Sequence, residues 1–359
     1  MTTTTIEQQV STPVVVAGVD THQRTHHAVV LTQTGARLAD KEFEVSRTGY
    51  AALLDWVASH GLIAKIGVES TGSYGAGLTI HLLAAGIEVI EVNRPDKTLR
   101  ARHGKSDVID AESAARSVLN GTATARPKAR TGVVEAIRVI KIPRDRAVKD
   151  RSAAMEQLRD LITTAPPTTI HDDLIGLTTR QRIARVAGYR PDQARLDDPT
   201  QATKQALRML AHRITALDTE IMAADKTLRA LTRQTVPTLL EMRQVGVQTA
   251  AQFVITAGQN IDRMHSEAAF ARLCGVSPIP ASSGHTSAGR VRLNRGGDRQ
   301  ANSALHLIIV GRLRSDPATR EYFQRRKAEH KTTAETIRCL KRHLARKIYR
   351  GLKTDLLTT

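Results

Sequence analysis

The order of the apolar runs in the first third of the chain constrains its fold more than any other feature. Three consecutive runs have the length and β-branched content of strands, and helix-like and strand-like segments alternate after them. Three leading strands followed by alternating units predict a mixed sheet flanked by helices, which is an α/β fold. The expected strands are residues 14–19, 27–32, 37–45, 64–69 and 87–92, and the expected helices are 48–60, 75–85 and 106–119.

Four carboxylates lie where these elements meet the surface. Asp20 follows the first strand, and Glu69 ends the fourth. Asp107 and Asp110 open the last helix, three residues apart and on one face. Carboxylates gathered in a cleft repel one another unless a cation neutralises them, and hard divalent cations prefer oxygen ligands. These residues therefore predict a phosphoryl-transfer site for Mg²⁺ or Mn²⁺, in the two-cation form with the cations about 4 Å apart.

Each of these residues also has an ordinary explanation. An Asp at a helix start is often a partner of the helix dipole, and Glu69 can be a solvated strand end. Glu112, in the same helix, is expected to point away from Asp110 into solvent, with a place in the site as the alternative. His22, His26 and His27 offer nitrogen ligands for a transition metal, but no distal His or Cys with matching spacing accompanies them. The occurrence of all four carboxylates on successive elements favours the divalent-metal site.

Charge is divided unevenly along the chain. Residues 1–125 hold 11 basic and 13 acidic side chains, whereas residues 126–359 hold 42 basic and 22 acidic ones. An acidic catalytic region followed by a basic body is expected of a protein that cuts a polyanion it must first bind. Aromatic residues make up only 3% of the chain, so base stacking is not expected to dominate the binding of nucleic acid.

Cysteine content and hydropathy indicate the compartment. Cys274 and Cys339 lack the spacing of a zinc site and are too few for a disulfide framework. No apolar run reaches 18 residues, and the first residues lack the charged start and apolar core of a signal peptide. We therefore expect a cytoplasmic, nucleoid-associated protein with no membrane span, in which residues 1–12 form a disordered tail.

A helical, coiled-coil middle region is expected at residues 126–235, between a catalytic domain at 13–125 and a mostly α-helical domain at 236–359. The middle region carries a heptad seam whose apolar positions alternate in steps of three and four. A helical hairpin, an intermolecular coiled coil, or both would use such a seam. The seam residues are Leu207, Leu210, Ile214, Leu217, Ile221, Ala224, Leu228 and Leu231.

Two segments of the last region carry candidate contacts to phosphate. Around Gly246 the pattern is helix, glycine turn, helix, which can direct backbone N–H groups at a phosphate. Further on, Ser282-Ser283-Gly284 lies in a loop rich in Gly and Pro, and a serine needs a base, a metal or strong electrostatic help to become a nucleophile. The arginines that would hold a phosphate beside it are Arg290, Arg292, Arg295 and Arg299.

Taken in order, these motifs resemble the DEDD transposases of bacterial insertion sequences, the "one-ten" family of serine-containing, RuvC-like recombinases. The N-terminal likeness lies in Gly18-Val-Asp20-Thr-His22, Val68-Glu69-Ser-Thr-Gly72 and Lys105-Ser-Asp107-Val-Ile-Asp110. The C-terminal likeness lies in Cys274-Gly-Val-Ser-Pro278, Ser282-Ser283-Gly284 and Leu293-Asn-Arg295-Gly-Gly-Asp-Arg-Gln-Ala-Asn302. The chain departs from the family at Gln244-Val-Gly-Val-Gln, where relatives more often carry Gly-x-Gly-Pro, and this weakens only the phosphate role of that turn.

The resemblance implies an RNase H-like N-terminal domain and a C-terminal transposase domain whose nucleophile is Ser283, with Ser282 as the rival position. Metal ions would activate the serine, which attacks a DNA phosphate and forms a covalent phosphoserine intermediate. Family members act as dimers or tetramers, and a noncoding RNA from the element pairs with target and donor DNA. DNA, a guide RNA and further copies of this chain are thus the expected partners. The implied tetrad is Asp20, Glu69, Asp107 and Asp110.

Three other functions fit parts of the sequence. A RuvC-like, structure-specific endonuclease would use the tetrad with a water nucleophile, and would need neither Ser283 nor a long basic C-terminal region. An actin-like sugar kinase also begins with strands and an early Asp, but it requires Gly-rich phosphate loops that this chain lacks. An inactive nucleic-acid-binding remnant of a transposase would not need all four carboxylates and the serine, which are present here.

Overall fold

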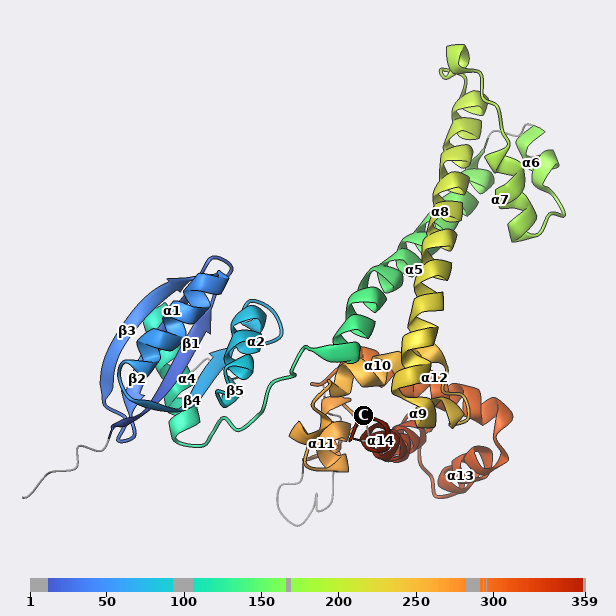
Figure 1. Ribbon diagram of the computed structural model, residues 1–359. Coiled ribbons are helices and arrows are strands. Elements are labelled where there is room, and N and C mark those ends of the chain that lie inside the picture. Colours follow the sequence, from blue (N-terminus) through green and yellow to red (C-terminus); the bar gives the residue numbers. More distant parts are fainter. Residues whose placement is uncertain are drawn as a thin grey trace, which may run out of the picture. The chain divides into compact units, whose positions relative to one another are not determined.

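The computed structural model describes residues 12–92, 106–165, 169–281, 291–292, 294 and 296–357 (Figure 1). The chain forms two compact units, each assembled from separate segments. Residues 1–11, most of the expected tail, lie outside the described residues. The first unit contains Met1–Gly132, Thr256–Gly297 and Leu356–Thr359, and the second contains Val133–Ile255 and Asp298–Asp355.

A five-stranded mixed sheet in the order β3-β2-β1-β4-β5 forms the base of the first unit. The β1–β2 and β2–β3 pairs are antiparallel, and the β1–β4 and β4–β5 pairs are parallel. The order of strands and helices expected from the sequence is confirmed, and each boundary lies within two residues of the expected one. The elements are β1 (Val14–Thr21), β2 (Thr25–Thr32), β3 (Arg37–Glu44), α1 (Arg47–Ala58), β4 (Leu62–Glu69), α2 (Ala76–Ala84), β5 (Val89–Val92) and α4 (Asp107–Leu119).

The two faces of this sheet bury separate apolar cores. Alternate residues of a strand point to opposite faces, so Val15, Ala17 and Val19 of β1 share one core with residues of α1 and α2. Val16 points the other way and joins a core with residues of α4. Asp20 lies four residues after Val16 and therefore shares the face that α4 covers.

Two glycines let α4 lie directly against this second face. A Cβ at Gly18 would overlap the backbone of α4 at Ala111 and Ala115, and one at Gly67 would lie 2.6 Å from a methyl carbon of Val118. Gly18 and Gly67 are direct neighbours in the parallel β1–β4 pair, so both strands accept the helix at one level. This close approach fixes where the first turn of α4 lies relative to the strand ends.

A long helical hairpin dominates the second unit (Figure 1). Its arms are α5 (Gly132–Thr164) and α8 (Pro199–Thr235). Arg144 and Arg151 of α5 form ion pairs with Asp225 and Asp218 of α8, respectively. Partner numbers fall along α8 as they rise along α5, so the arms run antiparallel.

The heptad seam of α8 faces the interior of this hairpin. Leu207 and Ile214 are fully buried in one core with Ala154 and Leu158 of α5. Further along the seam, Leu217 is half-buried. The helical hairpin, one of the arrangements expected for the seam, is thus present within a single chain. The intermolecular coiled coil stays a prediction.

Helices make up most of the remaining described sequence, as expected for the C-terminal region. Within the described ranges, no helix is both long and apolar enough to cross a bilayer. The remaining elements are α6 (Thr169–Leu174), α7 (Thr179–Ala187), α9 (Pro237–Glu241), α10 (Val247–Ala257), α11 (Glu267–Leu273), β6 (Ile279–Pro280), β7 (Val291–Arg292), α12 (Arg299–Ser315), α13 (Pro317–Ala328) and α14 (Thr333–Leu357), with single 3₁₀ turns at Gln193–Arg195 and Ile261–Arg263.

Candidate active site

The ends of β1 and β4 bring two carboxylates to adjacent positions. Val19 lies opposite Val68 in the parallel pair, so Asp20 and Glu69 come next on their strands. The Thr21 hydroxyl donates a hydrogen bond to the backbone oxygen of Glu69 at 3.1 Å, which ties the two strand ends together. Asp20 and Glu69 are only 6% and 4% exposed. Both predicted carboxylates are therefore buried at one end of the sheet.

The first turn of α4 supplies the other two carboxylates. Asp107 is the first residue of the helix, and Asp110 lies one turn later. Asp110 is 2% exposed, whereas the side chain of Asp107, at the helix end, is 45% exposed. Both aspartates act electrostatically on Asp20, so the first turn of α4 lies near the end of β1. The structure thus brings Asp20, Asp107 and Asp110 together, with Glu69 on the adjacent strand end.

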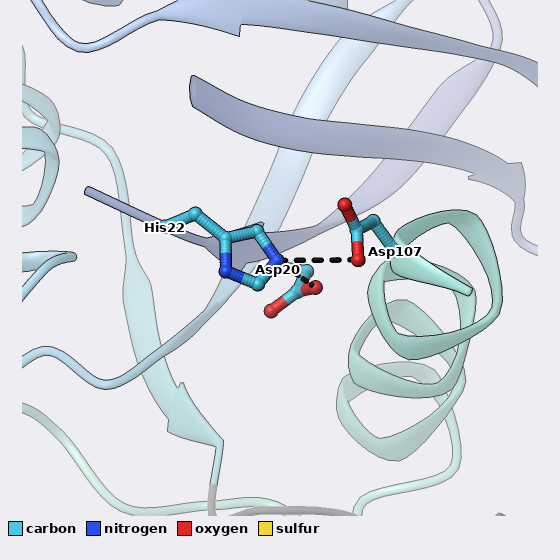
Figure 2. Close-up of side chains that lie close together, drawn as sticks. All are labelled: Asp20, His22 and Asp107. Atoms are coloured by element: carbon cyan, nitrogen blue, oxygen red, sulfur yellow. Dashed lines mark ion pairs between the residues drawn. The ribbon is translucent and has the colours of Figure 1, made fainter. Parts of the chain in front are cut away.

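A histidine joins this carboxylate group. His22 Nε2 lies 3.1 Å from a carboxylate oxygen of Asp20 and 3.2 Å from one of Asp107 (Figure 2). The imidazole thus links a carboxylate of β1 to one of α4. One ligand atom from each of the three residues lies within 4.8 Å of the others. A group of this composition can hold a cation with two oxygen ligands and one nitrogen ligand.

Burial makes negative charge unfavourable at this site. It raises the pKa of the Asp20 carboxyl; the neighbouring His22 opposes this shift, and the negative charges of Asp110 and Asp107 add to it. Asp20 Oδ2 and His22 Nε2 are shielded from solvent, and within the described residues neither makes an aligned hydrogen bond, although they lie 3.1 Å apart. Buried polar atoms left in this way destabilise a fold, and a bound cation would satisfy both. The oxygen-rich donor set therefore fits Mg²⁺ or Mn²⁺.

The other two histidines of this segment lie apart from the group. His26 is fully buried and stacks on Tyr50, and burial lowers its pKa. His27 Nε2 lies 2.9 Å from a carboxylate oxygen of Asp40 on β3. The three histidines therefore do not form the transition-metal site considered from the sequence.

Glu112 was expected to point into solvent, but its side chain is partly buried. Its side chain is only 23% exposed, and it forms ion pairs with Arg116 at 2.5 Å and with Arg37 at 3.6 Å. Arg37 belongs to the edge strand β3, so this pair attaches the sheet edge to α4. A helix residue that looks solvated in the sequence is held here by a cation from a distant strand.

The serine segment, Ser282-Ser283-Gly284, lies outside the described residues. Of the predicted contacts to phosphate that are described, Arg292 is exposed in β7 and Arg299 is exposed at the start of α12. A meeting of the serine with the carboxylates, which the family resemblance implies, therefore stays a prediction. The site residues outside the described ranges are Ser282, Ser283, Arg290 and Arg295.

The sequence gives only a weak indication that His22 belongs to the site. His22 directly follows the last residue of β1, and side chains two residues apart along extended backbone share a face, so it can point the same way as Asp20. Its second partner, Asp107, is distant in sequence and is brought close only by the packing of α4 on β1. No local pattern encodes that approach.

Both ends of the chain match models of transposase families. Residues 17–167 match a DEDD-type model described as Transposase, and they include all four carboxylates. Residues 236–324 match the model described as the Transposase IS116/IS110/IS902 family, and they include the serine segment. The two matches follow the order of the motifs in the sequence.

Proteins of insertion elements are similar over most of the chain. A 42 kDa protein of insertion element IS900 from Mycobacterium paratuberculosis is 27% identical, over 91% of this chain and 92% of its own length. A 43.6 kDa protein of insertion element IS110 from Streptomyces coelicolor is 24% identical, over 89% of each chain. The mini-circle putative transposase for IS117, also from S. coelicolor, is 27% identical over 58% of this chain and 52% of its own length. Through both matched models and these relatives, the chain belongs to the IS116/IS110/IS902 family of insertion-sequence transposases.

Proposed function

We propose that this transposase cuts and rejoins DNA by metal-dependent phosphoryl transfer. The observation that carries the proposal is the meeting of the buried Asp20 and Asp110 with the more exposed Asp107, with Glu69 on the adjacent strand end. The strand order and the placement of these residues on β1, β4 and α4 support an RNase H-like, RuvC-like domain. Family membership supports DNA as the substrate.

The four carboxylates are the proposed ligands for Mg²⁺ or Mn²⁺, with His22 as an additional donor. When bound, such cations lower the pKa of a coordinated oxygen and neutralise charge on the phosphate that is transferred. Asp20 lies beside His22, which also contacts Asp107, and this supports a central place for Asp20 in the group. Asp107 is the most exposed member, so its side of the group is open to a substrate phosphate.

Ser283 is the proposed nucleophile. Its Oγ would form a bond to a DNA phosphorus while the bond from that phosphorus to one deoxyribose oxygen breaks, and that oxygen would take up a proton. The phosphoserine diester keeps the energy needed for rejoining, which hydrolysis by water would lose. Gly284 permits a close approach of the backbone to a phosphate, and Ser282 is the neighbouring alternative. The arginines proposed to hold that phosphate are Arg290, Arg292, Arg295 and Arg299.

The proposal extends to a guide RNA and to self-association. A noncoding RNA from the element would pair with target and donor DNA, and the excess of 42 basic over 22 acidic residues beyond residue 125 favours binding of polyanions. The protein would act as a dimer or tetramer. Because Leu207 and Ile214 of the seam are buried within the chain, a coiled-coil contact would use the outer side of α8, where Met209 and Met222 are 63% and 64% exposed.

Trapping the covalent intermediate tests the nucleophile. Radiolabelled DNA that carries the ends of the element is incubated with the protein and Mg²⁺, and the labelled peptide is mapped by mass spectrometry after proteolysis. We expect the label on Ser283, with loss of the adduct in excess chelator and in Ser283→Ala. Ser282→Ala is the matched control and keeps the adduct. An adduct on Ser282 would move the assignment by one residue, and recombination by Ser283→Ala would overturn it.

A RuvC-like endonuclease with a water nucleophile is the second candidate, because the carboxylate group is complete without the serine. Such an enzyme would cut DNA in Mg²⁺ without any protein–DNA adduct. Its Ser283→Ala variant would cut at the wild-type rate. The trapping experiment therefore separates the two functions.

A further inference from the structure

Helix α14 separates apolar and cationic side chains onto opposite faces. Buried apolar residues recur every four positions along this helix. Arginines also recur every four positions, and each lies two residues before a buried one. A shift of two residues turns an α-helix by about 200°, so the row lies opposite the buried face. The buried residues of this four-residue repeat are Leu340, Leu344, Ile348 and Leu352. The arginine row, with Arg342 half-buried and the others exposed, consists of Arg338, Arg342, Arg346 and Arg350.

Acidic residues are absent from the helix segment that carries the arginine row. From Thr336 to Thr354 the sequence holds seven Lys or Arg and no Asp or Glu. The flanking Glu335 accepts a hydrogen bond from the hydroxyl of Thr332 at 2.7 Å, and Asp355 is 7% exposed. Like charges four residues apart oppose helix formation, so anions bound along the row would stabilise α14.

The positive charge of these arginines contributes to lowered pKa values of two neighbouring groups. The pKa of Lys341 is lowered by burial and then by Arg338. The pKa of His343 is also lowered, first by burial and then by the surrounding cations Arg346, Arg342, Arg326 and Lys347. Two groups on α14 thus lose protons more readily, because they are partly buried and because positive charges lie near them.

A basic cleft of about 580 Å³ adjoins the arginine row. Residues of α9, α12 and α14 line it, together with the turn that follows α9. One carboxylate, from Asp316, faces four cations in this lining. Arg350 belongs to both the row and the cleft, so the two form one continuous basic surface. The lining cations are Arg243, Arg312, Lys347 and Arg350.

Hydrogen bonds hold the walls of the cleft in position. Arg312 Nε donates to the backbone oxygen of Arg243 at 3.0 Å, and Arg243 Nη1 donates to that of Ser315 at 2.6 Å. Gln244, with a φ of +64°, donates from Nε2 to Ser315 Oγ at 3.0 Å. Gly351 allows α14 to approach α9, because a Cβ there would lie 2.7 Å from a methyl carbon of that helix. The cleft is therefore preformed.

We propose that the arginine row and the adjoining cleft bind the phosphate backbone of duplex DNA. This inference rests on the proposed function for its ligand, and it adds a site separate from the carboxylates and the serine segment. The guanidinium groups follow one another about every 6 Å along the helix axis, over about 18 Å, which suits an extended polyanion. Tyr349, the single aromatic residue of α14, is only 6% exposed, so the row offers no platform for stacking unpaired bases.

Duplex binding by the full-length protein in excess chelator, where no strand is cut, tests the proposal. A short fluorescent DNA duplex of random sequence is titrated at salt concentrations from about 50 to 200 mM. For Arg346→Gln combined with Arg350→Gln, the plot of log K against log salt should become shallower by about 2, because each phosphate contact contributes about 0.9. We expect binding at the low end of this range to weaken about tenfold.

Arg229→Gln combined with Arg233→Gln is the matched control, because these arginines are also exposed and four residues apart, on α8. It should leave binding unchanged. Arg346→Lys with Arg350→Lys keeps the charges and should keep the wild-type slope even if the Gln pair alters the fold.

Wild-type affinity and slope in a folded Gln pair would refute the proposal, and so would loss of the slope in the Lys pair. Binding of duplex RNA but not of duplex DNA would overturn the choice of ligand. Since no cleavage is measured, a failed serine mechanism would leave this outcome unaffected.

Discussion

The two compact units gather like charges in opposite ways. In the first, carboxylates from two strands and one helix converge at a buried point, where Asp20, Glu69 and Asp110 are each at most 6% exposed. In the second, guanidinium groups are spread along the outer face of α14. Low dielectric strengthens repulsion among the buried carboxylates, whereas solvent and salt screen the exposed row. The first arrangement therefore suits a compact cation at short range, and the second suits an extended anion.

Removing one buried carboxylate should have the largest effect. We expect Asp110→Asn to slow strand cleavage at least about a thousandfold, because the metal group loses a ligand, while duplex binding in chelator stays at the wild-type level. Cleavage assays with Mg²⁺ and binding assays without it measure the two effects separately. Asp40→Asn is the control, since Asp40 of the edge strand β3 pairs with His27 of β2 and lies outside the group. Normal cleavage by Asp110→Asn would break the contrast between the units.

Gly18→Ala tests whether the buried group depends on the close approach of α4. The new methyl group would overlap the helix backbone at Ala111 and Ala115, so we expect a loss of about 1–3 kcal/mol in the free energy of unfolding. Denaturant titration measures it. Gly72→Ala is the matched control, because a Cβ there would meet only Arg130 Nη2 at 3.7 Å. Equal stability of the two variants would show that α4 can shift without consequence.

Asp20→Asn should stabilise the metal-free protein at neutral pH. Burial raises the pKa of Asp20, so the folded state binds this proton more tightly than the unfolded state does. The stability that the protonated carboxyl contributes is complete below the unfolded pKa and is lost as the pH rises through the folded value. In excess chelator we expect the Asn variant to be more stable than the wild type at pH 7, with the difference vanishing in acid. Mg²⁺ should raise the melting temperature of the wild type only. A wild type that is more stable than the variant in chelator at pH 7 would contradict this.

Single changes in the arginine row should have the smallest effects. We expect Arg338→Gln to weaken duplex binding only a few-fold, because exposed phosphate contacts contribute separately. Its effect should add to that of Arg350→Gln, which lies three turns away. The carboxylates should behave differently, with Asp20→Asn plus Asp110→Asn cutting no more slowly than either single variant. Equilibrium binding and single-turnover cleavage rates of these variants measure whether the effects add. Additive effects of the two carboxylate substitutions would contradict the expected difference between the units.

Local patterns predict much of the first unit. The apolar runs identified every described strand of the five-stranded sheet, and Asp20 and Glu69 were recognisable because a strand end is a local feature. The contact between His22 and Asp107 was not predictable in this way. It depends on α4 resting on Gly18, and the residues around Gly18 do not specify which helix will cover it.

The second unit was less predictable because its apolar seam specifies a buried face but no partner. Ile214 would be buried equally well by α5 of the same chain or by a second copy, and the sequence left both open. The pairs that fix the hairpin register, such as Arg151 with Asp218, join residues far apart in sequence. The same holds for Arg243 and Arg312, which meet in the cleft only through the packing of distant helices.

The divided make-up of the first unit affects how the protein emerges from the ribosome. The chain leaves this unit after Gly132 and returns to it at Thr256. At about 5–20 residues per second, synthesis of the intervening stretch takes roughly 6–25 s. The sheet and its carboxylates can fold during that interval, before the segment with Ser283 exists. A nascent chain would thus possess its metal ligands for many seconds without its proposed nucleophile, and a product of interrupted translation would be unable to attach itself to DNA through that serine.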